Sequence, residues 1–435
     1  MAVATDEFFA LAKAEAFGWG LPGLPIAVVP HPLAKLDAEQ CAAVAAKALP
    51  EVAAALTDPA EDLEARYRGK TISTSGRLRY KSLFDSQFNA PDAPARIRGP
   101  GSIEALNRVF YGRGWTDGLP VLPPTPGRCE AMLDGRDPDE VVAVVEPRLG
   151  KATLGKIAAN AVMAGCEPAH FAVVLAATRA MCDPAFNLKA IQSTTHPCTV
   201  GCLVGGPVCE AIGVNGAYNA LGQGSKANAV IGRAIRLILV NVGGASPGAL
   251  DRSTMGSPAK YALCFAENTE ASPWLPFHDD LGLDPASSHV TVFGVEGPHN
   301  VNDHYGRSAE EILLTVAGTL ASPGANNFYL EGEPVVVLGP EHAEVVAAAG
   351  FSKDRVKAFL SEKAIVPRAL VSDAMISELE KRLPHHLLGP AGRDGVRFVT
   401  NPEDLLVLVA GGAGRHSAVL PTFGHSTRAV TRAIE

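Results

Sequence analysis

Four short apolar runs that end in glycine or in Gly-Pro constrain the fold of this chain more than any other feature. The sequence reads CLVGGP at 202–207, VTVFGVEGP at 290–298, VVVLGP at 335–340 and LLVLVAGG at 405–412. Runs of this length, rich in valine and closed by turn residues, are typical of buried strands. A helical run follows each of the first three. The first two also continue alike, with Val-Asn, then a helical run, then Ser-Pro-Gly.

This repetition predicts an α/β fold. We expect the large region to be built from repeated strand–loop–helix units over about 160–250, 262–325 and 328–435. In sheets of such units, the loops gather at the carboxyl ends of the strands, where ligands bind.

Length and charge limit the class of protein. The chain has 435 residues, which predicts more than one domain, and a formal net charge of −8, which opposes a nucleic-acid or acidic-membrane partner. No segment has the roughly 20 uncharged residues of a membrane span, and the first residues lack the basic start of a signal peptide. We expect a cytoplasmic protein whose eight cysteines are reduced.

Residues 1–68 predict a small βαβα unit. AVAT and LPIAVVP are strand-like, DEFFALAKAEAFG is helical, and LDAEQCAAVAAKALPEVAAALT is a second helix with Asp37 placed as its cap. This order implies two parallel strands. Residues 69–100 are polar and punctuated by Pro and Gly, which predicts an extended linker or arm before the large region, 101–435.

The segment TTHPCTVGCLVGGPVC (194–209) holds three cysteines and a histidine. His196, Cys198 and Cys202 are the candidate metal ligands, but their spacing matches no recognised zinc motif. Two cysteines four apart in a strand share a face at a separation of roughly 13 Å. Packing in a core strand is therefore favoured, with a lone reactive thiol and a metal site as alternatives.

Cys166 is a candidate nucleophile. In NAVMAGCEPAHF, Pro168 fits the first turn of a helix, so Cys166 lies near a helix N-terminus. That position lowers a thiol pKa. The alternative is a small buried residue between two alanine-rich helices.

The segment GVNGAYNALGQGSKANAVIGRAIRL (213–237) is a candidate substrate-binding loop. It follows an apolar strand and leads into a helix, an arrangement whose backbone N–H groups bind anions. The candidate ligand-binding residues are Asn215, Asn219, Lys226, Asn228 and Arg233. The alternative is a turn-rich connector with asparagines in turn conformations.

Residues 251–282 are dense in groups that can exchange protons or bind a substrate. The candidates are Asp251, Lys260, Glu267, Asn268, Trp274 and His278. A helix over KYALCFAENTE would place Lys260 and Glu267 on one face, and together with His278 they would form an acid–base site beside Trp274. The alternative is a surface salt bridge in a solvated loop. Other histidines, including the pair His385-His386, are scattered and predict no metal site.

The sequence resembles the UGSC-type (seleno)protein family. DEFFALAKAEAFGWGLPGLPIAVVPHPLAKLDAEQ and EVAAALTDP resemble the later part of the small UGSC unit. WTDGLPVLPPTP, NAVMAGCEP and GSPAKYALCFAENTEASPWLPFH resemble the large protein associated with it. The resemblance implies a Cys or Sec–Gly–Ser–Cys motif before the first strand, and this chain has none there. It therefore implies a small partner subunit that carries the motif, or a start that omits it.

We expect the large subunit of a thiol-dependent heteromeric enzyme for a small polar or anionic molecule, with reductive or covalent lyase-type chemistry. Lys260, Glu267 and His278 would move protons, and the partner's thiol or Cys166 would react. His196 keeps a claim to the site. One alternative is a lyase or hydratase with a metal on His196, Cys198 and Cys202. The other is a non-catalytic scaffold for a thiol subunit. No other cofactor is expected. We expect the protein to form an oligomer.

Overall fold

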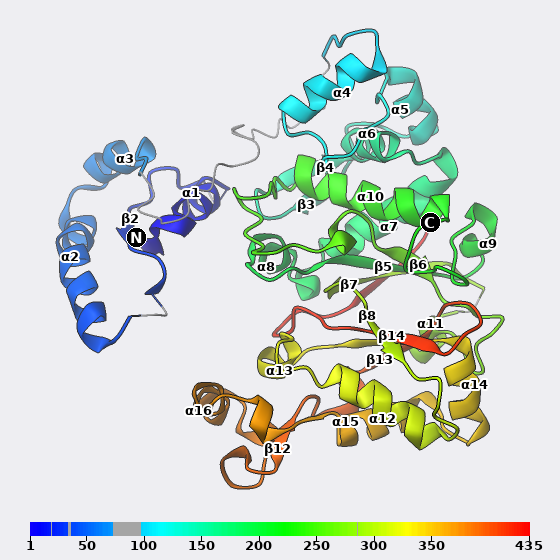
Figure 1. Ribbon diagram of the computed structural model, residues 1–435. Helices are drawn as coiled ribbons and strands as arrows, with labels where there is room; N and C mark the ends of the chain where they lie inside the picture. Colours follow the sequence, from blue (N-terminus) through cyan, green and yellow to red (C-terminus); the bar gives the residue numbers. More distant parts are fainter. Residues whose placement is uncertain (19, 34–35, 73–96, 285) are drawn as a thin grey trace.

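The computed structural model describes residues 1–18, 20–33, 36–72, 97–284 and 286–435 (Figure 1). Most of the expected linker at 69–100 lies outside these residues. Within them, the fold is α/β, as the sequence predicts, with a small N-terminal unit and a larger region.

Two four-stranded sheets form the centre of the large region. The first sheet has the order β15-β7-β5-β6 and the second has the order β13-β9-β14-β8. The strands of the first are β5 (Thr199–Gly205), β6 (Cys264–Ala266), β7 (His289–Val295) and β15 (Val430–Ala433). Those of the second are β8 (His299–Asn302), β9 (Val335–Leu338), β13 (Leu406–Val409) and β14 (His416–Leu420). The four predicted glycine-ended runs are β5, β7, β9 and β13.

The two sheets pack face to face, because successive side chains of each strand point alternately into an outer core and into the core between the sheets. In β5, Cys202 and Val204 join the core under the helices, whereas Leu203 joins the core between the sheets. In β9, Val336 faces the outer core and Val337 the inner one. Because successive strand residues point to opposite faces, both sheets are buried on both sides. This burial explains why the sequence shows continuous apolar runs rather than alternation.

Helices cover the two outer faces, which gives four layers (Figure 1). The first sheet is covered by α7 (Phe171–Met181) and α10 (Lys226–Asn241), and α6 (Leu154–Ala164) packs on these two helices. The second is covered by α12 (Ala309–Leu320), α14 (Pro340–Ala348) and α15 (Lys353–Lys363). Shorter helices at the sheet edges are α8 (Leu188–Ser193), α9 (Val208–Ile212), α11 (Phe277–Asp280) and α13 (Asn327–Leu330).

The expected gathering of all loops at one edge is wrong for the first sheet. β5 pairs with β6 in parallel but with β7 in antiparallel orientation. The chain between β6 and β7 has only the one-turn helix α11, and an antiparallel pair needs no crossover helix. The loop after β7 therefore lies at the edge where β5 and β6 begin.

Two smaller parts flank the sandwich. The hairpin β3 (Val141–Val145) and β4 (Gly150–Thr153) packs with α4 (Ile103–Gly112) and α5 (Pro126–Leu133) above the first sheet (Figure 1). A three-stranded sheet contains β10 (Ile365–Val366), β12 (Gly395–Arg397) and β11 (Leu387–Leu388), in that order. Helix α16 (Asp373–Arg382) packs with it.

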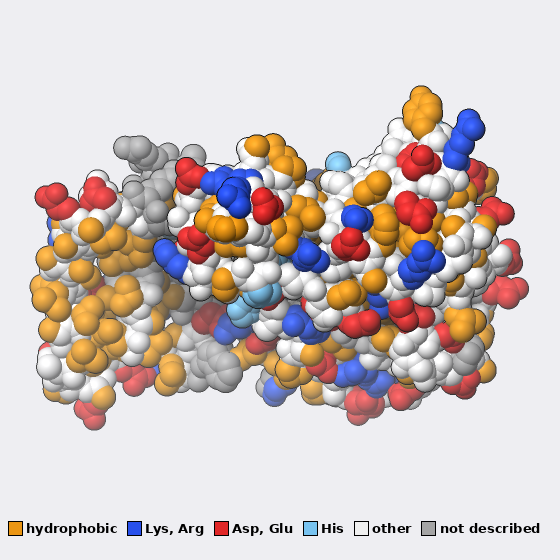
Figure 2. All heavy atoms as spheres, turned by 90° about the horizontal axis from the view of Figure 1, so that it is seen from below, with side chains coloured by type: hydrophobic (Ala, Val, Ile, Leu, Met, Phe, Trp, Pro, Cys, Tyr) orange, Lys and Arg blue, Asp and Glu red, His pale blue; other side chains and the backbone are white. Residues whose placement is uncertain are grey.

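The N-terminal unit has the predicted parallel pair. Its elements are β1 (Ala2–Thr5), α1 (Phe9–Gly18), β2 (Ile26–Val29), α2 (Ala38–Thr57) and α3 (Ala60–Arg68). β1 and β2 are parallel, and the side chain of Asp37 caps α2 by accepting from the Gln40 backbone N–H. Many of its apolar side chains are exposed (Figure 2), among them Leu49 and Leu56 of α2.

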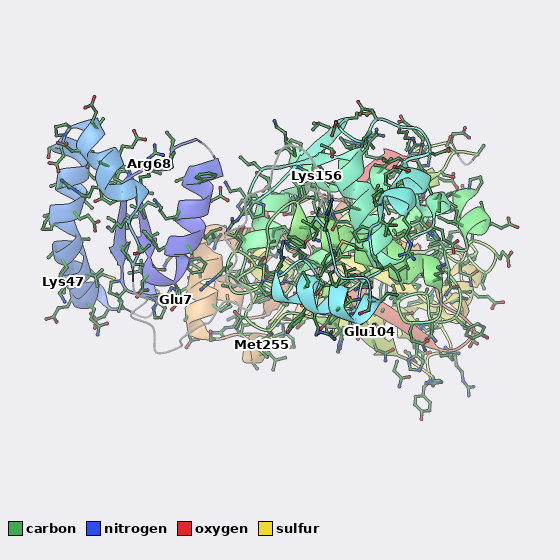
Figure 3. The ribbon with its side chains drawn as sticks, turned by 90° about the horizontal axis from the view of Figure 1, so that it is seen from above. Glu7, Lys47, Arg68, Glu104, Lys156 and Met255 are labelled. Atoms are coloured by element: carbon green, nitrogen blue, oxygen red, sulfur yellow. The ribbon has the colours of Figure 1, made fainter. Side chains whose placement is uncertain are left out.

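The N-terminal unit contacts the sandwich through ion pairs. Arg252 binds Glu7 at 2.9 Å and covers the ring of Phe8, and Lys189 of α8 pairs with Glu15 of α1. Figure 3 shows Glu7 at the boundary between the two parts, whereas Lys47 lies on the far side. Across the described ranges, no helix combines the length and the apolar character needed to cross a bilayer.

Candidate functional site

The candidate site lies at the edge of the first sheet where β5 and β6 begin and β7 ends. His196 precedes β5, Lys260 precedes β6, and Glu296 directly follows β7. The antiparallel orientation of β7 is what brings Glu296 to this edge. Three segments far apart in the sequence thus contribute polar side chains to one place.

His196 and Glu296 form the central pair of the site. His196 Nε2 lies 2.7 Å from Glu296 Oε1, and the ring packs edge-on against Phe423 with a centroid separation of 5.9 Å. The His196 side chain is only 10% exposed, and its buried Nδ1 has no hydrogen-bond partner among the residues that the structure describes. When Nε2–H donates to the carboxylate, neutral Nδ1 carries a lone pair. A histidine oriented this way by a carboxylate is suited to accept a proton.

Two further buried polar atoms, close to His196 in the sequence, have no partner within the described ranges. They are Gln192 Nε2 and Ser193 Oγ, both at the end of α8. Buried donors and acceptors are nearly always paired, and leaving one unpaired costs about 1–3 kcal/mol. Three such atoms within five residues, 192–196, make this segment the candidate for binding a polar ligand.

A buried charge cluster lies beside this surface. Lys260 Nζ binds both carboxylate oxygens of Asp251, at 2.9 and 2.7 Å. Arg236 of α10 donates to the Lys260 carbonyl at 2.9 Å and to Thr199 Oγ1 at 3.0 Å. Burial lowers the pKa of Lys260, although Asp251 opposes that effect. The space between Thr199, Arg236 and Lys260 is too narrow for a water molecule, so these groups set the local field from behind the surface.

The predicted metal ligands do not converge. Cys198 is buried with its Sγ 3.8 Å from the Ile191 carbonyl oxygen, and Cys202 lies inside β5 opposite Cys264 of β6. His196 is bound to Glu296 instead. Within the described residues, no cluster of three ligand side chains includes His196, Cys198 or Cys202. Cys198 and Cys202 thus pack the core strand, as the strand-like context favours.

Cys166 lacks the features expected of a nucleophile. Burial raises its pKa to about 12, and its Sγ lies 3.4 Å from the Val230 carbonyl oxygen. This is opposite to the lowering expected near a helix N-terminus, because the thiol lies under α10, where desolvation outweighs the attraction of Lys226. Burial likewise raises the pKa of Cys182, Cys198 and Cys209 to about 12.

The side chains of the 213–237 segment mostly bind the protein itself. Asn228 Oδ1 accepts from the Asn215 backbone N–H, and Asn228 Nδ2 donates to the Asn215 and Ala220 carbonyls. Asn219 has a left-handed φ of 59°, typical of asparagine in a turn. Lys226 pairs with Glu167, and Arg233 binds Asp117 through two hydrogen bonds. Residues 213–225 therefore form a turn-rich connector, and the charges of Lys226 and Arg233 are already paired.

The predicted acid–base trio is divided between two edges. The expected helix over KYALCFAENTE is wrong, because Cys264–Ala266 forms β6 beside β5. Lys260 therefore lies before the strand and Glu267 after it. His278 lies at the Glu267 edge, where its ring packs against Gly205 and its Nε2 bonds Thr291 Oγ1 at 3.2 Å.

The second edge holds groups in structural roles. Glu267 accepts backbone N–H groups from Phe277 at 2.6 Å and Val409 at 3.4 Å, and burial raises its pKa to about 7. Burial lowers the pKa of His278 to about 4. Asn268 Nδ2 donates to Gly411, and Trp274 Nε1 donates to Phe351. These side chains join loops of the two sheets.

Sequence reasoning thus singled out His196, Lys260 and Asp251, but not Glu296, the partner of His196, nor the unpartnered groups of Gln192 and Ser193. Glu296 stands in the run VTVFGVEGP, directly after a predicted strand. Its position as the first charged residue after a buried strand was an available signal. Gln192 and Ser193 gave no signal, because nothing in the sequence shows which polar atoms a fold leaves unpaired.

Comparison with known proteins supports the N-terminal resemblance. Residues 1–58, from β1 to α2, match the UGSC family. The match does not extend into the large region, so the likeness stated for that region stays a prediction. No curated protein and no solved structure matches the chain.

Proposed function

We propose that this chain supplies the substrate-binding and proton-transfer part of a thiol-dependent enzyme for a small polar or anionic molecule. The observation that carries the proposal is the His196–Glu296 pair with a buried, unpartnered Nδ1 next to Gln192 Nε2 and Ser193 Oγ. Together these atoms offer one proton acceptor and two groups that can bind a polar substrate. His196 is the general base and Glu296 its positioning residue.

The charge cluster favours an anionic or carbonyl group in the substrate. Behind the site stand two cations, Arg236 and Lys260, and one carboxylate, Asp251. Their net charge of +1 offsets the carboxylate of Glu296, and it acts through a water-free interior, where electrostatic effects are stronger than in water. A negative charge that develops on the substrate is stabilised there.

The N-terminal unit is the expected docking place for a thiol partner. It binds beside the site, because Arg252, which holds Glu7, follows Asp251 directly. Within the described residues, its sheet has only two strands, and Val3 of β1 and Leu56 of α2 are exposed. Two-stranded sheets are marginal in water, and exposed apolar surface marks an interface. A small subunit with a CGSC- or UGSC-type motif is the partner that the family match favours.

The proposed step is the addition of the partner's thiol to a double bond of the substrate, with His196 transferring the proton. His196 Nδ1 accepts the proton of the partner's thiol, and the thiolate forms an S–C bond with an electrophilic substrate carbon. The electron pair of the attacked C=X bond moves to X, which takes the proton back from His196. Since the chain's own buried thiols are held in the neutral form, they are poor substitutes for the partner's thiol.

The test begins with purification of the tagged chain from its native host and intact-mass analysis of what accompanies it. In the complex, the alkylation rate of the partner's thiol by iodoacetamide is measured against pH, for the wild type and for His196→Gln. The expected result is a slower reaction near pH 7 with His196→Gln and no change with the control His299→Gln, an exposed histidine on β8.

Two outcomes oppose the proposal. A homo-oligomer without any small thiol subunit would refute the heteromeric enzyme. Equal alkylation rates in an intact complex would refute the role of His196 and favour a scaffold.

A further inference from the structure

A second group of side chains, outside the site above, converges on a single carboxylate oxygen. Glu331 Oε1 lies 2.9 Å from His385 Nε2 and 3.0 Å from His386 Nε2. The two imidazole rings meet edge-on with a centroid separation of 4.7 Å. One ligand atom from each residue lies within 4.8 Å of the other two. Within the described ranges, this is the one group of three such side chains that is close enough to share a metal ion.

The backbone carbonyl of Arg397 fixes which ring nitrogen of His386 carries a proton. Its Nδ1 lies 2.7 Å from the Arg397 carbonyl oxygen, which only accepts, so Nδ1 carries a proton. In a neutral ring, Nε2 then points a lone pair at the Glu331 carboxylate. Two acceptor atoms then face each other across 3.0 Å, and a metal ion between them would bind both.

From this geometry we infer that Glu331, His385 and His386 form a binding site for one divalent transition-metal ion. A metal ion accepts both lone pairs and the carboxylate at once. The bond from His386 to a backbone carbonyl is the usual support of a metal-binding histidine, since it fixes the tautomer and the ring orientation. Two imidazoles and one carboxylate suit Zn²⁺ and related ions.

The two N–O distances require only a small adjustment, and the two ring nitrogens lie within 4.8 Å of each other. Two ligand atoms about 2.0–2.1 Å from a tetrahedral ion lie about 3.3 Å apart. The two N–O separations of 2.9 and 3.0 Å would each widen by a few tenths of an ångström. His385 is 54% exposed and Glu331 is 41% exposed, so an ion can enter from solvent and keep a water as its fourth ligand.

The backbone of the carboxylate ligand is held in place independently. Glu331 has a φ of 56°, rare for a residue other than glycine and costly by about 1–3 kcal/mol. Asn327 Nδ2 donates to the Glu331 carbonyl at 2.8 Å, and the His425 backbone N–H donates to Leu330 at 2.7 Å. These bonds fix the conformation that aims Glu331 at the histidines.

The ion would join two parts of the fold. Glu331 follows α13 and precedes β9 of the second sheet, whereas His385 and His386 lie between α16 and β11 of the three-stranded sheet. The sequence analysis predicted no metal site at His385-His386, because the third ligand, Glu331, is 54 residues away from His385 in the sequence. The inference does not depend on the proposed role of His196.

The test uses the full chain, stripped with a chelator and titrated with Zn²⁺ against a chromogenic competitor. We expect one tight Zn²⁺ per chain, and visible absorption bands when Co²⁺ replaces it. Because Glu331→Gln and His385→Gln each remove one of three ligands, each is expected to weaken Zn²⁺ binding at least about 100-fold, the upper end of what loss of a mere supporting partner costs. Both positions are exposed enough to change without disturbing the core.

Two controls make the result specific. His299→Gln removes an exposed histidine elsewhere and should leave Zn²⁺ affinity unchanged, as should His196→Gln. Binding without the Co²⁺ bands, or equal affinity in wild type, Glu331→Gln and His385→Gln, would overturn the site. Zn²⁺ affinity lost with His196→Gln instead would place the metal at the other site and refute this one.

Discussion

Glu267 gives the protein a stability that depends on pH. Its carboxyl has a pKa of about 7 in the fold against an ordinary value of 4.5, because burial disfavours the charged form. The folded chain therefore holds this proton more tightly than the unfolded chain does. The stabilisation is complete below about pH 4.5 and is lost as the pH rises through about 7.

The size of the effect follows from those two values. At about 1.4 kcal/mol per pKa unit, the full difference is worth about 3 kcal/mol, and most of it, about 2 to 3 kcal/mol, is lost between pH 5 and pH 8. Glu267→Gln removes the titration but keeps an oxygen that can accept the Phe277 backbone N–H. The variant should therefore gain stability relative to wild type as the pH rises.

The assay is urea unfolding at pH 5 and pH 8, followed by the fluorescence of the tryptophans, of which Trp274 lies in the loop after Glu267. The difference in unfolding free energy between variant and wild type should shift by about 2 to 3 kcal/mol in favour of Gln. Other groups titrate in both proteins and cancel. Glu270→Gln, an exposed neighbour, is the matched control. A shift below about 0.5 kcal/mol, the usual range of surface changes, would refute the reasoning.

Three further predictions concern the charge pair, the packing and the thiols. Lys260→Met leaves Asp251 buried without its cation and should lower the free energy of unfolding in urea by about 3–5 kcal/mol. The double variant Lys260→Met with Asp251→Leu should recover most of that loss. An equal loss in the single and the double variant would show that the pair is not coupled. Gly216→Ala should lower the melting temperature measured by calorimetry, because its Cβ would lie 2.2 Å from the Glu267 carbonyl oxygen, whereas Gly213→Ser, with open space around it, tests the strain of a positive φ alone. Ellman's reagent should react fast with Cys41 of the exposed face of α2 and slowly with the buried thiols; a fast phase that persists in Cys41→Ser would contradict this order.

The strands were predictable because burial on both faces leaves a local mark. Four runs of apolar residues that end near a glycine were predicted as strands, and the structure has a strand in each of them: β5, β7, β9 and β13. The orientation of β7 was not predictable, because the sequence of a short buried strand is the same for parallel and antiparallel pairing. That one reversal decides whether Glu296 meets His196.

The candidate site was predictable only in part, for the same reason. His196 is a conspicuous residue next to a predicted strand, Lys260 and Asp251 stand out as a charged pair of candidates, and the fold brings the three to one edge. Glu267 and Lys260 lie at opposite ends of β6 rather than on one helix face. Residues Cys264–Ala266 form this strand because they pair with β5. The Glu331 cluster depends on contacts between distant segments, which no local pattern records.

The strand order has a consequence for how the protein is made. β14 lies between β9 and β8, and β15 pairs with β7, so residues 416–433 complete both sheets. A ribosome releases β8 more than 100 residues before its partner β14. During that interval the nascent chain exposes apolar strands that cannot close, which slows folding and invites aggregation. Demand for chaperones should therefore peak late in translation, and a nonsense codon near residue 415 should yield aggregates rather than a shortened native protein.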